Sequence, residues 1–181
     1  HSLSRRQRQM CIRDRNIRHL VEMAAKEDMF VRLDMEDHRV TTATIDAVLA
    51  LHKEGLTNVG TVLQGRLFRT LADIDSLEES LGPGADYRIC KGIYLEPEDI
   101  SFTNYSDIVD ATNAAIDRMF AAGSYVGVAS HDQPVIDHTL SALKAHGMGP
   151  GIEDPRPNAG PARHQKGPGY EFQMLLGVRG P

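Results

Sequence analysis

The feature that most limits the fold of this chain is a repeated alternation of short apolar runs with segments of helical period. The apolar runs start at five positions, Phe30, Val59, Tyr87, Tyr125 and Tyr170. The first three starts are 29 and 28 residues apart, which is the length of one strand and one helix. Repeated strand-then-helix order predicts an α/β fold with parallel strands and right-handed crossovers.

Segments with helical start and stop signals separate most of these runs. The apolar side chains of Ile45, Val48 and Leu49, for example, recur at the spacing of one helix face. A glycine closes three of the segments, as is common at helix ends. We expect helices at about residues 16–28, 41–55, 108–123 and 132–147.

A polar side chain comes late in each of the five runs. Parallel strands are buried on both faces, so such a group needs a partner or serves chemistry. The residues concerned are Asp34, Gln64, Lys91, His131 and Gln173. Polar strand ends on one common rim are typical of a (β/α)₈ barrel. The glycine-rich phosphate motifs of an open doubly wound sheet do not occur, which favours the barrel.

The charge of the chain is unevenly distributed. Residues 1–18 hold six arginines and one aspartate, a balance of +5. Because the net charge of the whole chain is −5, the remaining residues together carry −10. We interpret residues 1–15 as a non-native basic extension and the chain as a fragment, because it begins with His and its start lacks apolar periodicity. Nucleic-acid binding would depend on these arginines alone, and we expect none.

Cysteine and histidine spacing excludes several kinds of site. The two cysteines, Cys11 and Cys90, are far apart, which predicts neither a disulfide framework nor a zinc site and favours a cytoplasmic setting. No HxH or HExxH pair occurs, so we expect no metal. No apolar run is long enough to span a membrane. Cys90, between apolar neighbours, is expected to be an unreactive thiol.

Several candidate residues have both a structural and a functional interpretation. Arg32 could pair with Asp34 or Glu36 on the same strand face, or Asp34 could hold a substrate ammonium group or its lysine partner. Arg88 could simply pair with the neighbouring Asp86. Alternatively, Arg88 and Lys91 form a cationic pair beside Gly92, which would let a flat or phosphorylated ligand approach the backbone. Lys91 could also form a Schiff base, as in barrel aldolases.

Five stretches, taken in order, resemble the catalytic domain of the proline dehydrogenase family, in particular its short monofunctional bacterial form. They are FVRLDMEDHRVTTATIDAVLALHKEG, NVGTVLQGRLFRTLADIDSL, YRICKGIYLEPEDISF, YVGVASHD and YEFQMLLGVR. The resemblance implies a (β/α)₈ TIM barrel that holds FAD non-covalently and oxidises L-proline to Δ1-pyrroline-5-carboxylate. It also implies electron transfer to a quinone, at peripheral sites on the inner face of the cytoplasmic membrane.

The resemblance also assigns roles to residues of this sequence. Asp34 would be the catalytic carboxylate that organises the substrate, and Arg88 the cation near flavin N5. The remaining expected FAD contacts are Met35, Gln64, Lys91, Gly92, Ile93, Ser130, His131 and Gln173.

Some parts of the family pattern are missing from this sequence. The resemblance covers strands two to six of the barrel, without the strand bearing a substrate-facing lysine and without the arginine pair that binds the proline carboxylate. We therefore expect a partial barrel domain over residues 16–181 that is inactive alone. Residues 147–169, rich in Gly and Pro, are expected to form a disordered loop. The alternatives are a Schiff-base aldolase using Lys91 and a non-catalytic half-barrel.

Overall fold

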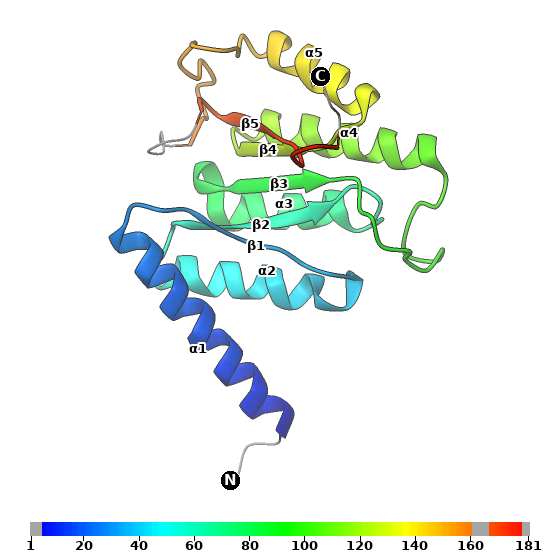
Figure 1. Cartoon of the computed structure of the whole chain (residues 1–181). Coiled ribbons are helices and arrows are strands. Elements are labelled where there is room, and N and C mark those ends of the chain that lie inside the picture. The colour runs from blue at the N-terminus through cyan, green and yellow to red at the C-terminus, as the bar shows by residue number, and fades with distance from the viewer. Residues whose placement is uncertain (1–4, 161–166, 179–181) are drawn as a thin grey trace.

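The computed structural model describes residues 5–160 and 167–178 and contains one parallel sheet (Figure 1). The strands are β1 (Val31–Leu33), β2 (Val59–Gln64), β3 (Asp86–Cys90), β4 (Tyr125–Ala129) and β5 (Tyr170–Gln173). They pair in the order β1-β2-β3-β4-β5, each parallel to the next. The predicted α/β order and the five strands are confirmed, and each predicted strand start lies within one residue of the observed one.

The helices are α1 (Arg5–Lys26), α2 (His38–Lys53), α3 (Thr70–Leu81), α4 (Tyr105–Ala121) and α5 (Gln133–Ala145), with a 3-10 turn at Gly82–Gly84. Helices α2 to α5 lie along one face of the sheet, and the face turned toward the viewer in Figure 1 carries no helix of the described chain. One covered and one helix-free face is the arrangement expected for part of a barrel wall.

Helices α1 and α3 differ most from the sequence prediction. Helix α1 begins at Arg5, eleven residues before the predicted start at 16. Helix α3 was not predicted at all, although its buried Ile74 and Leu77 have helical spacing. Helix α2 begins three residues early because the Asp37 carboxylate accepts a 2.8 Å hydrogen bond from the Arg39 backbone N–H and so caps the helix.

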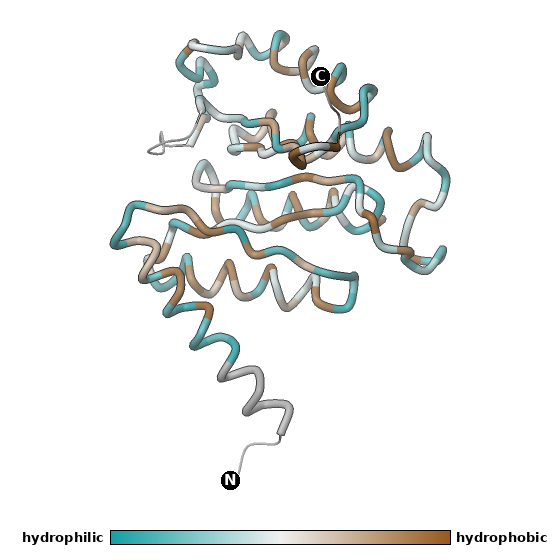
Figure 2. Tube along the Cα trace, viewed as in Figure 1, coloured by the Kyte–Doolittle hydropathy of each residue, from teal (hydrophilic) through white to brown (hydrophobic). Residues whose placement is uncertain are grey.

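The main hydrophobic core lies between the sheet and the helices. Its largest fully buried side chains include Tyr87 of β3 and Ile116, Met119 and Phe120 of α4. A smaller cluster packs α1 and α2 against the start of β2 through Val21, Val48, Leu51 and Val59. Figure 2 shows this pattern as hydrophobic colour along the central strands. Such burial supplies most of the favourable free energy of folding.

The segment 147–169, for which disorder was expected, packs on the domain in its described part. Arg156 is buried, and its guanidinium donates hydrogen bonds to the carbonyl oxygens of Phe120 at 2.9 Å and Ser124 at 3.1 Å. Asn158 donates to Ala121 O at 2.9 Å. These donors bind carbonyl groups at the end of α4 and in the turn that directly follows it. Residues 161–166 lie outside the described part of the chain.

Truncating a core side chain of α4 tests this packing. Ile116→Ala should lower the free energy of unfolding by about 2–5 kcal/mol, because it leaves a cavity beneath the sheet. The exposed Leu140→Ala on α5 is the matched control and should have an effect of under about 1 kcal/mol. Urea unfolding followed by circular dichroism measures both, and equal losses would contradict the described core.

The Asp154–Arg156 contact predicts a pH dependence of stability. Burial acts to raise the pKa of Asp154, but hydrogen bonds and charge from Arg156 outweigh burial and hold that pKa below its usual value. The stabilisation is therefore present above the unfolded-state pKa and lost as the pH falls through the folded-state pKa.

Asp154→Asn should accordingly destabilise the chain at pH 7 more than at about pH 3. The exposed pair Asp75–Arg118 provides the control, since Asp75→Asn should change little at either pH. Thermal unfolding at several pH values measures the difference, and a pH-independent effect of Asp154→Asn would refute the prediction.

Candidate functional site

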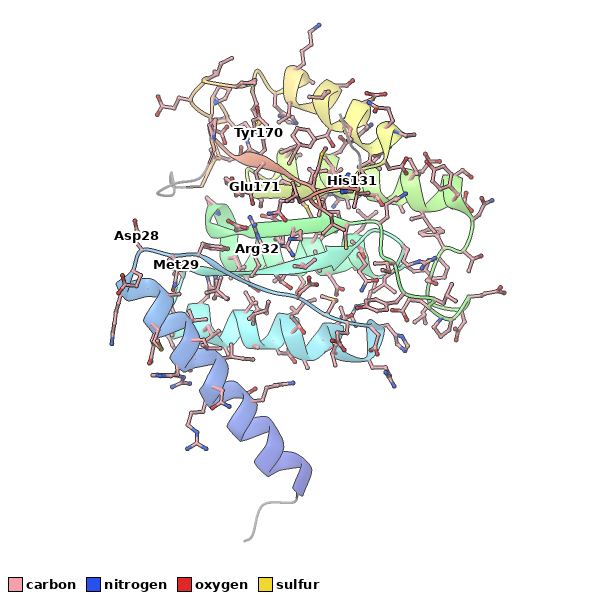
Figure 3. The ribbon with its side chains drawn as sticks, in the orientation of Figure 1. Asp28, Met29, Arg32, His131, Tyr170 and Glu171 are labelled. Atoms are coloured by element: carbon pink, nitrogen blue, oxygen red, sulfur yellow. The ribbon has the colours of Figure 1, made fainter. Side chains whose placement is uncertain are left out.

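A cavity of about 980 Å³ opens at the carboxyl ends of β3, β4 and β5. Its walls come from segments that directly follow strands, including Asp34 after β1, Lys91 to Ile93 after β3, and Ser130 to Asp132 after β4. Figure 3 labels His131 at this edge of the sheet. Parallel pairing therefore brings residues that are far apart in the sequence to one rim.

Most residues that the sequence singled out line this cavity. They are Asp34, Arg88, Lys91, Gly92, Ile93, Ser130, His131 and Gln173. The other two, Met35 and Gln64, line a neighbouring cavity of about 420 Å³ that shares Asp34, Cys90, Gly92 and Ile93 with the first. Ile93 is 85% exposed, whereas Met35 is buried and its sulfur accepts a hydrogen bond from Thr41 Oγ1 at 3.1 Å.

Arg88 joins two of the predicted site residues. Its Nε donates a 2.5 Å hydrogen bond to Gln173 Oε1, and its Nη1 lies 3.4 Å from Asp34 Oδ2. The sequence allowed an Arg32–Asp34 pair and an Arg88–Asp86 pair, and neither is found among the ion pairs of the described residues. Arg32 pairs with Asp86 at 2.8 Å and with Glu171 at 2.6 Å, and not with Asp34. The ion-pair partner of Asp86 is therefore Arg32 and not Arg88.

Lys91 lies in a polar cluster that the sequence reading missed. Its Nζ is 2.5 Å from Asp132 Oδ2 and 4.9 Å from the ring centre of Tyr105. The Tyr105 hydroxyl donates to both Asp132 oxygens at 2.8 Å. Asp132 occupies the N-cap position of α5, but its side chain makes no capping hydrogen bond. The sequence signal that could have identified Asp132 as part of the site is its position directly after the strand-end residue His131.

Gly92 is required by backbone geometry and by space. Its φ of +96° lies in the region that side chains disfavour. A Cβ there would come 2.8 Å from Gln64 Oε1 and 2.9 Å from Arg66 Cδ. The backbone after β3 can therefore lie against Gln64 only because residue 92 has no side chain.

Two buried polar atoms of the predicted site residues have no hydrogen-bond partner within the described chain. They are Gln64 Oε1 and His131 Nδ1. The other ring nitrogen of His131 accepts a 2.9 Å bond from the Leu175 backbone N–H, so in the neutral ring Nδ1 carries the proton. An unsatisfied acceptor and an unsatisfied donor are costly in isolation and ready to bind a polar ligand.

Cys90 lines both cavities as a neutral thiol. Burial raises its pKa to about 11, with a further contribution from the negative charge of Asp34, while a hydrogen bond from the Gly92 backbone N–H and the positive charge of Arg88 act in the opposite direction. The thiolate is the reactive form, so Cys90 reacts slowly near neutral pH. This agrees with the unreactive thiol expected from the sequence.

No group of three or more His, Cys, Asp and Glu side chains in residues 5–160 and 167–178 could hold a metal ion. No helix in the same part of the chain is long and apolar enough to cross a membrane.

Comparison with known proteins gives consistent matches. A family model described as proline dehydrogenase matches residues 2–178, a range that includes most of the arginine-rich stretch 1–15. Proline dehydrogenase from Deinococcus radiodurans is 34% identical over 165 residues, covering 91% of this chain and 47% of that protein. Proline dehydrogenase 2 from Bacillus subtilis strain 168 is 34% identical over 164 residues, with the same coverage.

Solved structures show the same fold. Proline utilization A (PutA) from Bdellovibrio bacteriovorus, inactivated by N-propargylglycine, superposes with a TM-score of 0.75 at 18% identity and covers 92% of this chain and 18% of that one. A mutant PutA from Bradyrhizobium japonicum gives a TM-score of 0.73 at 18% identity, covering 92% and 17%.

The chain spans about half the length of the curated relatives it matches. The family model nevertheless matches nearly all of it, and the fold agrees with the barrel expected from the sequence. The resemblance read from the five strand motifs is thus confirmed, and the chain belongs to the proline dehydrogenase family.

Proposed function

We propose that this chain supplies the FAD-binding part of an enzyme that oxidises L-proline to Δ1-pyrroline-5-carboxylate. One observation carries the proposal. The acceptor Gln64 Oε1 and the donor His131 Nδ1 are buried without hydrogen-bond partners among the described residues, and each belongs to a residue that lines one of the two cavities. Membership of the proline dehydrogenase family supports the substrate.

The cavity residues fit the chemistry of FAD. The heteroaromatic ring system of a flavin offers both donors and acceptors, which suits Gln64 and His131. Its phosphates suit a cationic partner, and Lys91 beside Gly92 offers an ammonium group next to accessible backbone. Ser130 is buried at the same rim and adds a hydroxyl, and Ile93 and Gln173 line the cavity.

Arg88 and Asp34 would carry the catalytic roles. When bound, FAD supplies the acceptor for the hydride that proline loses. Arg88 holds a fixed cation at the cavity wall, where it stabilises negative charge that develops during reduction. The Asp34 carboxylate is 60% exposed and open to a substrate ammonium group while Arg88 stays on its other side.

Transfer of electrons to a quinone, with peripheral membrane contact, belongs to the same proposal. Support comes from apolar side chains that stand exposed at the rim of the cavity, among them Ile93 and Leu175. Their neighbours Leu95 and Leu176 are also exposed. Exposed apolar side chains gathered at one rim are typical of contact sites.

The Schiff-base aldolase alternative is weaker on this geometry. A Schiff-base lysine attacks as a free amine. The Lys91 ammonium is instead engaged by the Asp132 carboxylate and lies over the Tyr105 ring. The non-catalytic half-barrel differs from the proposal in one measurable property, which is that it would not bind FAD.

FAD binding therefore tests the proposed function. Equilibrium dialysis with the whole chain should show saturable binding, weakened about tenfold or more in Arg88→Met and in Lys91→Met, because each loses a cation in the cavity. Lys144→Met, on the exposed side of α5, is the charge-matched control and should bind like the parent. Absence of binding, or an equal loss in all three variants, would refute the proposal.

A further inference from the structure

A continuous chain of polar contacts crosses the helix-free face of the sheet. Starting at the cavity, it runs from Asp34 to Arg88, Gln173, Glu171, Arg32 and Asp86. Figure 3 labels Arg32 and Glu171 on this face, and their side chains are 2.6 Å apart. Strands β1, β3 and β5 supply most of its members, so it links strands that are not neighbours in the sheet.

Gln173 has a defined amide orientation within this chain. Its Oε1 accepts from Arg88 Nε at 2.5 Å, and its Nε2 donates to Glu171 Oε1 at 2.5 Å. A flipped amide would direct its NH₂ group at the guanidinium, which has no acceptor. The acceptor that fixes the amide is Glu171, itself held by Arg32 Nη1 and by the Tyr125 hydroxyl at 3.2 Å.

Gly127 makes this contact across β4 sterically feasible. The strand register places Gly127 directly between Arg88 of β3 and Glu171 of β5. A Cβ on residue 127 would come 2.9 Å from Gln173 Nε2 and 3.3 Å from Glu171 Oε1. The missing side chain in the middle strand therefore leaves the space in which the outer two strands exchange hydrogen bonds.

We propose that Glu171 and Gln173 are positioning residues that hold the Arg88 guanidinium toward the cavity, with Gly127 providing the gap they need. The ligand that Arg88 would contact in the cavity, FAD, rests on the proposed function. The positioning itself is a property of this chain with or without a cofactor. Glu171 acts on Arg88 only through the Gln173 amide, and this order of action can be tested.

Cys90 reports the position of Arg88 without any cofactor. It lies two residues after Arg88 on β3, lines the same cavity, and feels the charge of the guanidinium. In a Cys11→Ser background it is the single cysteine of the chain. The rate of its alkylation by iodoacetamide at about pH 9 then follows the thiolate fraction.

Gln173→Leu and Glu171→Met should each slow this alkylation about threefold, because the cation moves away and the thiolate becomes less favourable, by about half a pKa unit. Glu171→Gln keeps an acceptor for the Gln173 amide and should retain most of the rate. Lys144→Met, on the exposed side of α5, is the control and should leave the rate unchanged.

The double variant separates positioning from independent structural effects. If Glu171 acts through Gln173, Glu171→Met adds no further slowing in the Gln173→Leu background, whereas independent effects multiply. A further threefold slowing, or no effect of either single variant in chains with parental circular dichroism, would overturn the inference. Should Glu171→Met fail to fold, Gln173→Leu and Gly127→Ala still decide it, since both must slow alkylation.

FAD affinity measured on the same variants keeps the two proposals distinct. If the parent binds no FAD but the alkylation rates change as expected, the proposed function fails and the positioning role stands. If the parent binds FAD while Gln173→Leu leaves both FAD affinity and alkylation unchanged, the positioning role fails and the proposed function stands.

Discussion

Parallel pairing of the five strands is the constraint on which the rest of this structure depends. Because every strand runs in the same direction, the residue that follows each strand arrives at one edge of the sheet. Asp34, Lys91 and His131 are far apart in the sequence and become neighbours of one cavity for this reason alone. The helices on the opposite face supply the apolar burial that keeps the strands in register.

The helix-free face of the sheet carries several charged side chains from different strands. A strand face covered by helices would make Arg32, Arg88 and Glu171 costly to bury. Here they compensate one another in a connected series of ion pairs and hydrogen bonds. These contacts also hold the Arg88 guanidinium at the cavity wall. The compensation of these charges and the proposed role of Arg88 therefore depend on the same contacts.

The sequence predicted the strands and the rim residues because both follow from local pattern. Short apolar runs such as Val59–Gln64 are typical of strands buried on both faces, and a polar group at the end of such a run needs a partner or serves chemistry. The partners could not be predicted in this way. The bond between Arg88 and Gln173 requires the register of three strands and the absence of a side chain at Gly127. The Lys91–Asp132 contact likewise depends on two loops meeting at the rim.

Protection of Cys90 by FAD tests the central claim most directly, because it asks whether the cofactor occupies this cavity. In the Cys11→Ser chain, saturating FAD should slow alkylation of Cys90 severalfold at about pH 9, since a bound ligand covers the thiol. Lys91→Met should require more FAD for the same protection. An alkylation rate that is unaffected by FAD at concentrations that saturate binding would show that the cofactor binds elsewhere and would contradict the account.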